Sequence, residues 1–191
     1  MTRGARWIVA CTFAAAAPVP FACDAGPLKA AVAFGVLVGA AQGLAIAAPL
    51  PRRVLWAVVT CVGSWAAYPF GLLAGVVAAF GVVSIAVVIP GAGEFVKGAG
   101  PLLVAAPIGG LAGGALVGGF QAGLVRDARR WIVRSALGGV ALVATAAIVL
   151  YGSAAGHCAE LPIAALTLLS GLSGAFYGWL TAGYAPLAPP L

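Results

Sequence analysis

Charged side chains are scarce in this chain of 191 residues. They make up 7% of it, against about 25% in an ordinary soluble domain. Hydrophobic residues make up 63%, and a soluble fold of this size has too little interior to bury so much apolar surface. The shortage of charge therefore excludes an ordinary soluble domain and predicts an integral membrane protein.

Acidic residues and histidine are scarcer still, with four Asp and Glu residues and one His. None of them falls within a predicted membrane-spanning segment, which argues against an intramembrane proton relay. Serine and threonine residues in those segments have no histidine nearby to act as a general base. The Gly-rich stretches lack the lysine of a phosphate-binding loop. We therefore expect a protein that is not an enzyme and carries no cofactor.

Metal-binding patterns such as C-x-x-C and H-x-x-x-H are missing as well. Two predicted loops hold a group of ligand-type residues, namely Cys23, Asp24, His157, Cys158 and Glu160. Joint chelation by His157 and Cys158 is awkward because the two residues are adjacent. We expect no metal site here and interpret His157 as a solvated loop residue.

Basic residues give the chain a net charge of +6 but occur in short clusters between apolar segments. No basic stripe interleaved with aromatic residues is present, so nucleic-acid binding is not expected. Clusters of this kind are typical of loops on the cytoplasmic side of a membrane. The clustered residues are Arg3, Arg6, Arg52, Arg53, Arg126, Arg129, Arg130 and Arg134.

An internal repeat organises the apolar segments. The pattern G-x-x-x-G-x-x-[QT] occurs three times, ending at Gln42, Gln121 and Thr181. Each copy follows an apolar segment headed by a tryptophan, which is Trp7, Trp56 or Trp131. We therefore predict three helical hairpins, over about 7–48, 54–125 and 131–184, in a single transmembrane domain of residues 1–191.

Six spans with both termini in the cytoplasm place eight of the ten basic residues on the inner side, as the positive-inside rule requires. We expect a bacterial inner membrane, with the three tryptophans at the inner headgroup level. The first 25 residues resemble a secretory signal. Because bulky Phe21 makes a lipoprotein-type site at Cys23 unfavourable, we expect this segment to be retained as the first helix.

Residues 54–90 form an apolar stretch that is too long for one span, since 37 residues of helix reach about 55 Å. A seventh span would reverse the side on which Arg126–Arg130 lie. We therefore predict a kink or break at Pro69 and a re-entrant or interfacial segment near 71–90.

Gln42, Gln121 and Thr181 are the candidate polar residues of the bundle. They either hydrogen-bond between helices as packing contacts or surround a central pocket for a small molecule. Arg134 lies one turn after Trp131, and either extends to the inner headgroups or contacts an anionic lipid or substrate. Cys23 and Cys158 fall in two short loops on the outer side, so a disulfide between them is possible.

A non-catalytic role fits these features best. The leading hypothesis is an accessory or scaffolding subunit of a larger membrane complex, with the bilayer and other membrane subunits as partners. The alternative is a small-molecule carrier or the substrate-binding membrane subunit of a transporter. In size and hydropathy alone, the chain is similar to the substrate-capture subunits of vitamin importers. An aromatic and polar cavity favours the carrier, and a filled bundle favours the scaffold.

Overall fold

The computed structural model describes residues 2–20, 27–46, 48–98, 100–154 and 162–184, and every regular element in these ranges is helical. The prediction of an all-α protein is therefore confirmed. The elements are α1 (Arg3–Ala16), α3 (Pro27–Ala45), α4 (Leu50–Ala86), α5 (Gly93–Lys97), α6 (Gly100–Gln121), a short 3₁₀ turn η1 (Ala122–Leu124), α7 (Ala128–Ala154) and α8 (Ile163–Ala182).

Three of the described helices are long and apolar enough to cross a membrane. They are α4, α6 together with η1, and α8. A hydrocarbon core about 30 Å thick needs roughly 20 apolar residues in a helix, and each of these segments meets that length. The structure is thus consistent with insertion into a membrane.

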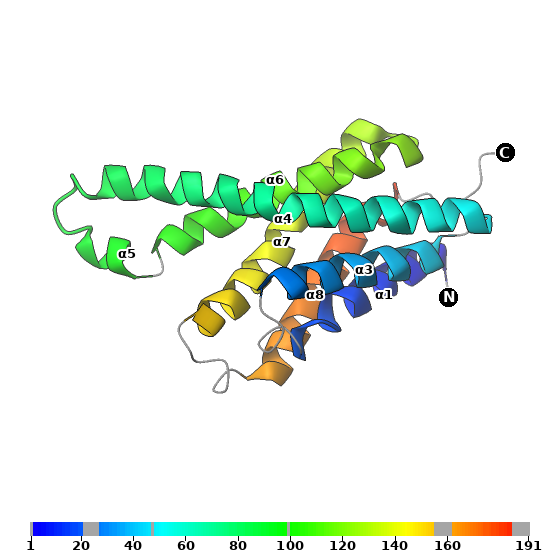
Figure 1. Ribbon diagram of the computed structural model, residues 1–191, viewed down its shortest axis with the longest axis horizontal. Helices are drawn as coiled ribbons and strands as arrows, with labels where there is room; N and C mark the ends of the chain where they lie inside the picture. Colours follow the sequence, from blue (N-terminus) through cyan, green and yellow to red (C-terminus); the bar gives the residue numbers. More distant parts are fainter. Residues whose placement is uncertain (1, 21–26, 47, 99, 155–161, 185–191) are drawn as a thin grey trace.

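The six long helices form a closed ring, in which each packs against two neighbours. Around the ring the order is α1, α3, α4, α6, α7 and α8, with α8 returning to α1. Helices α1 and α4 begin at the same end of the bundle (Figure 1). The paired helices α4 and α6 extend beyond the others at the opposite end, where the short helix α5 lies (Figure 1).

The glycines of the repeat lie at three equivalent helix contacts. A Cβ atom added to Gly39 on α3 would lie 2.6 Å from the Ala57 carbonyl oxygen on α4. The same close approach brings Gly118 of α6 to Ile132 of α7, and Gly178 of α8 to Ile8 of α1. Small residues allow such close packing between helix backbones. The glycine helix of each repeat therefore packs against the tryptophan helix of the next repeat, and the third packs against the first.

The predicted break at Pro69 is absent. Helix α4 continues without a break through Pro69 to Ala86, so residues 71–86 belong to the same helix and do not form a separate re-entrant segment. A proline removes one backbone hydrogen bond from a helix, and packing against α6 holds the two halves together here. Gly71 lies against Gly109, and Gly75 lies against Ala105.

Neighbouring glycines on α6 test the role of these contacts. A Cβ atom at Gly118 would lie 2.9 Å from the Ser135 Cβ, whereas one at Gly119 would have no neighbour within 4 Å. We expect Gly118→Ala to lower the free energy of unfolding by about 1–3 kcal/mol through overpacking. The matched variant Gly119→Ala should be unaffected or slightly stabilised. Melting temperatures in mild detergent measure both, and equal values would contradict the close α6–α7 contact.

Candidate functional site: a tryptophan cluster beneath a central cavity

Trp7, Trp56 and Trp131 meet in the middle of the helix ring and form a tryptophan cluster. Their ring centroids are 5.6–6.1 Å apart in edge-to-face arrangements, a geometry that the charge distribution of aromatic rings favours. All three side chains are at most 1% exposed. The indoles point into the protein and pack against one another rather than against lipid, and their level at the inner headgroups stays a prediction.

Each indole N–H of the cluster donates a hydrogen bond to the polar residue that ends a repeat. The Trp7 Nε1 donates to the Thr181 Oγ1 at 2.9 Å. The Trp56 Nε1 donates to the Gln42 Oε1 at 3.2 Å, and the Trp131 Nε1 donates to the Gln121 Oε1 at 3.1 Å. The structure therefore brings together all three polar residues that the sequence singled out, and each one bonds to the tryptophan of the following repeat.

The two glutamine amides also bond back to their own repeats. The Gln42 Nε2 donates to the Cys11 Sγ at 3.5 Å, and the Gln121 Nε2 donates to the Thr60 Oγ1 at 2.8 Å. Cys11 and Thr60 each follow a cluster tryptophan by four residues. Each glutamine thus links two successive repeats through the two ends of its amide group.

In the third repeat, two residues divide the role of the glutamine. Thr181 accepts from Trp7 but is too short to reach back to Ser135, the residue four after Trp131. Instead the Tyr177 hydroxyl, one turn before Thr181, lies 3.4 Å from the Ser135 Oγ. Its ring packs against Gly138, where a Cβ atom would clash with it.

Sequence reasoning missed four members of this network, namely Cys11, Thr60, Ser135 and Tyr177. A signal for three of them was present, because the pattern W-x-x-x-[CTS] occurs once in every repeat. The Gln121 Nε2 also donates to the Gln42 Oε1 at 3.5 Å. No buried side-chain nitrogen or oxygen atom among the described residues lacks a hydrogen-bond partner, so the network is closed.

A central cavity of about 570 Å³ lies directly on the network and is lined by side chains from all six long helices. Gln42, Thr60 and Tyr177 of the network are among its lining residues, and all three are buried. Val38 and Val117, the equivalents of Tyr177 in the first two repeats, line the cavity as well. No charged side chain is among the described residues around it. The cavity therefore suits a neutral, mostly apolar molecule.

Arg134 caps the end of α8. Its Nη1 donates to the Leu180 carbonyl oxygen at 2.8 Å, and its guanidinium carbon lies 4.5 Å from the centroid of the Tyr184 ring. A cation beside the last carbonyls of a helix is favourable, so this side chain stabilises the bundle. Contact with an anionic lipid stays a prediction.

The residues of the predicted disulfide, Cys23 and Cys158, lie outside the described ranges. Cys11 and Cys61, the two cysteines within them, are free, so the structure gives no support for a disulfide. The group of ligand-type residues in the two predicted loops also lies outside the described ranges. Elsewhere in the described chain, no three ligand-type side chains come together.

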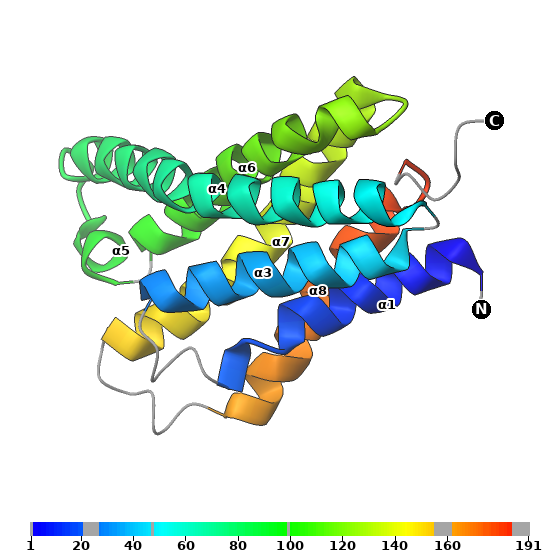
Figure 2. The same cartoon turned by 45° about the vertical axis from the view of Figure 1, so that its right-hand side comes forward.

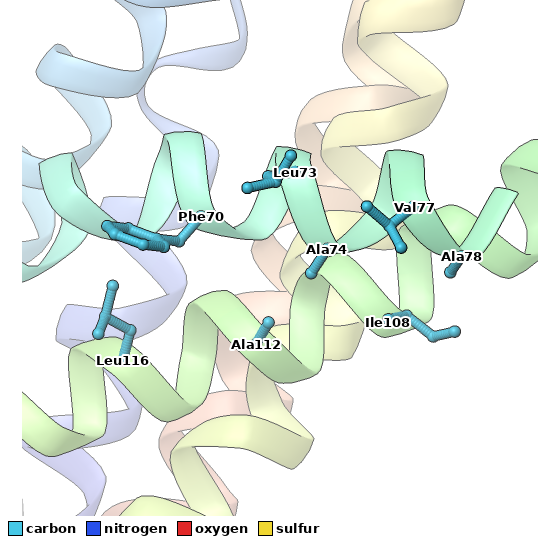
Figure 3. Close-up of a pocket in the computed structure, with 8 residues that line it drawn as sticks. All are labelled: Phe70, Leu73, Ala74, Val77, Ala78, Ile108, Ala112 and Leu116. Carbon is cyan, nitrogen blue, oxygen red and sulfur yellow. The ribbon is translucent and has the colours of Figure 1, made fainter. Parts of the chain in front are cut away.

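A second hollow is a groove of about 590 Å³ between α4 and α6. Figure 3 shows the eight residues that line it, all of them apolar. Phe70, Leu73 and Val77 project from α4, and Leu116, Ala112 and Ile108 follow along α6 (Figure 3). The large side chains of α4 here are more than 60% exposed, so the α4–α6 groove faces away from the bundle.

No protein-family model, no curated protein and no solved structure matches this chain. Arguments about its function therefore rest on the tryptophan cluster, the central cavity and the α4–α6 groove.

The network predicts strong coupling between Gln121 and Trp131. Gln121→Leu leaves the buried Trp131 N–H without its partner and should cost about 1–3 kcal/mol of unfolding free energy. Trp131→Phe should also destabilise, because it leaves the Gln121 oxygen unpaired and removes packing. We expect the double variant to lose clearly less than the sum of the two.

Unfolding in detergent, followed by circular dichroism, measures this coupling. Trp179→Phe is the matched control, since Trp179 is 64% exposed and should tolerate the change. Strictly additive losses in the double variant would rule out a direct bond between Gln121 and Trp131.

Proposed function

We propose that this chain is a membrane protein that binds a small neutral molecule in its central cavity, as a carrier or as the substrate-binding membrane subunit of a transporter. One observation carries the proposal: a cavity with no charged side chain among its described lining residues lies on a closed network of tryptophan, glutamine and threonine side chains. A filled bundle would have favoured a purely structural role.

The size and chemistry of the cavity support binding. Small-molecule sites usually measure about 300–1,000 Å³ and combine apolar walls with a few placed polar groups. The central cavity, at about 570 Å³, has hydroxyl and amide groups among its lining side chains. Burying an ion there would be costly, because no described lining residue can neutralise it. The cavity therefore suits a neutral ligand.

The proposal includes six membrane spans in three hairpins, with both termini on the cytoplasmic side of a bacterial inner membrane. The basic residues support this orientation. Arg3, Arg52 and Arg129 lie at the starts of α1, α4 and α7, which are the helices that carry the tryptophan cluster. The positive-inside rule then places the cluster near the cytoplasmic side, and the cavity extends from there toward the outer side.

A cavity-filling variant tests ligand binding, and the repeat itself suggests the substitution. Val117 is the second-repeat equivalent of Tyr177, so Val117→Tyr gives the second repeat the residue that the third repeat already has. Gly63 is likewise the second-repeat equivalent of Gly138, against which the Tyr177 ring packs. We expect Val117→Tyr to fold but to lose the small molecule that co-purifies with the wild-type protein in mild detergent. Mass spectrometry of organic extracts measures the loss.

Val36→Tyr is the control for this experiment. Val36 is 49% exposed on α3 and does not line the cavity, so the same substitution there should leave the bound molecule in place. A wild-type protein that carries no small molecule, or equal retention by Val117→Tyr, would contradict the proposed function.

The role of accessory subunit is a second candidate, and the α4–α6 groove favours it. An apolar groove can receive a helix of another membrane protein, although hydrocarbon chains can fill it equally well. If the chain serves a larger complex, extraction from native membranes should recover larger membrane subunits with it in fixed stoichiometry. Replacement of Ala112 by Trp would then release them, and recovery of the chain alone would contradict this role.

A further inference from the structure

Helices α3 and α4 approach each other closely only near the end where α4 begins. Gly43, Gly39 and Gly35 of α3 successively contact α4, and the last of these lies against Ser64. Beyond that contact the two helices separate toward the other end of the bundle, as both views show (Figure 1, Figure 2).

The separation has a physical cause in the continuity of α4. Its second half packs against α6, where Gly71 and Gly109 approach so closely that a Cβ atom on either would lie within 3 Å of the carbonyl oxygen of the other. An unbroken helix cannot follow both α6 and α3 when these two diverge. Helix α4 follows α6, and a side of the ring opens toward α3.

The central cavity reaches the surface at this opening. Phe34 and Val38 line it from α3, and Tyr68, Leu72 and Val76 line it from α4. Leu72 and Val76 are also 56% and 41% exposed, so they face the cavity and the surroundings of the protein at once. Side chains in that position form the rim of an entrance.

We propose that the separation between α3 and α4 is a lateral portal through which a neutral molecule with a hydrocarbon body and a hydroxyl or carbonyl group enters the central cavity from the lipid phase. The inference rests on the proposed function and adds the route of entry and the ligand class. The rim of the portal is apolar, so a molecule dissolved in the hydrocarbon layer can pass through it without first entering water.

A ladder of hydroxyl groups supports the ligand class. Thr60, Ser64 and Tyr68 lie four residues apart on one face of α4 and all line the cavity. Among the hydrogen bonds of the described residues, the Ser64 and Tyr68 hydroxyls take part in none. Hydroxyls in apolar surroundings favour a partner, and a ligand hydroxyl or carbonyl can be that partner.

Two photoreactive probes in phosphatidylcholine vesicles test the route. One is a phosphatidylcholine with a diazirine at the end of one acyl chain, and its headgroup keeps it at the membrane surface. Its chain reaches the cavity only through a lateral opening. The other is a free long-chain alcohol with the same diazirine, which can enter by any path. Adducts are located by peptide mass spectrometry after illumination.

We expect both probes to label cavity residues such as Phe34 and Val117 in the wild-type protein. Leu72→Trp should reduce cavity labelling by the phospholipid probe to background, since the larger ring fills the portal, while the alcohol continues to label. Val62→Trp, on the exposed side of α4 and away from the cavity, should change neither.

The possible failures are distinguishable. Cavity labelling by the alcohol but not by the phospholipid would overturn the portal and leave the proposed function standing. Absence of cavity labelling by either probe would overturn both.

The ligand class has its own test in Tyr68→Phe, which keeps the ring and removes the hydroxyl. Labelling by the alcohol probe should require about two- to tenfold more probe, as expected for one lost hydrogen bond. Labelling by a diazirine alkane of the same length should be unchanged. Equal effects on the alcohol and the alkane would overturn the role of the hydroxyl ladder.

Discussion

The hydrogen bond between a buried indole and the polar residue of the preceding repeat is the interaction on which this bundle depends. An indole N–H that is removed from water must find an acceptor, and each of the three tryptophans finds one at the end of a glycine helix. The bond requires the glycine helix of one repeat to lie against the tryptophan helix of the next. The closed ring follows when the third repeat meets the first.

The glycine contacts and the hydrogen-bonded tryptophan network together account for the space that remains as the central cavity. The glycine contacts bring the helices close near the tryptophan cluster, whose large rings fill the space there. Farther along the bundle, α4 packs closely against α6 and turns away from α3, and the space between the helices stays unfilled. The third repeat departs from three-fold equivalence, because Thr181 replaces the glutamine and Tyr177 replaces the valine of the other repeats, and the Tyr177 side chain lines the cavity.

Much of this arrangement was predictable, although not its geometry. The repeat marked Gln42, Gln121 and Thr181 as equivalent, and they do gather at one place. The tryptophans were placed at the inner headgroup level because indoles prefer interfaces, but the sequence did not predict that their rings pack against one another and bond to buried acceptors. Pro69 was expected to kink or break a helix. No break occurs, because tertiary contacts on both sides of the proline hold α4 together.

Composition and repetition in the sequence by themselves determined the apolar helical class, the equivalence of three polar positions and the scarcity of ionisable groups. These properties depend on residue types and spacing alone, so they can be predicted without knowing which helices pack against one another. Only the tertiary structure decided which repeat each glutamine bonds to, where the indoles point and that a cavity opens between α3 and α4. Hydrogen bonds and voids between helices depend on helix separations and angles, which are fixed only when all six long helices pack at once.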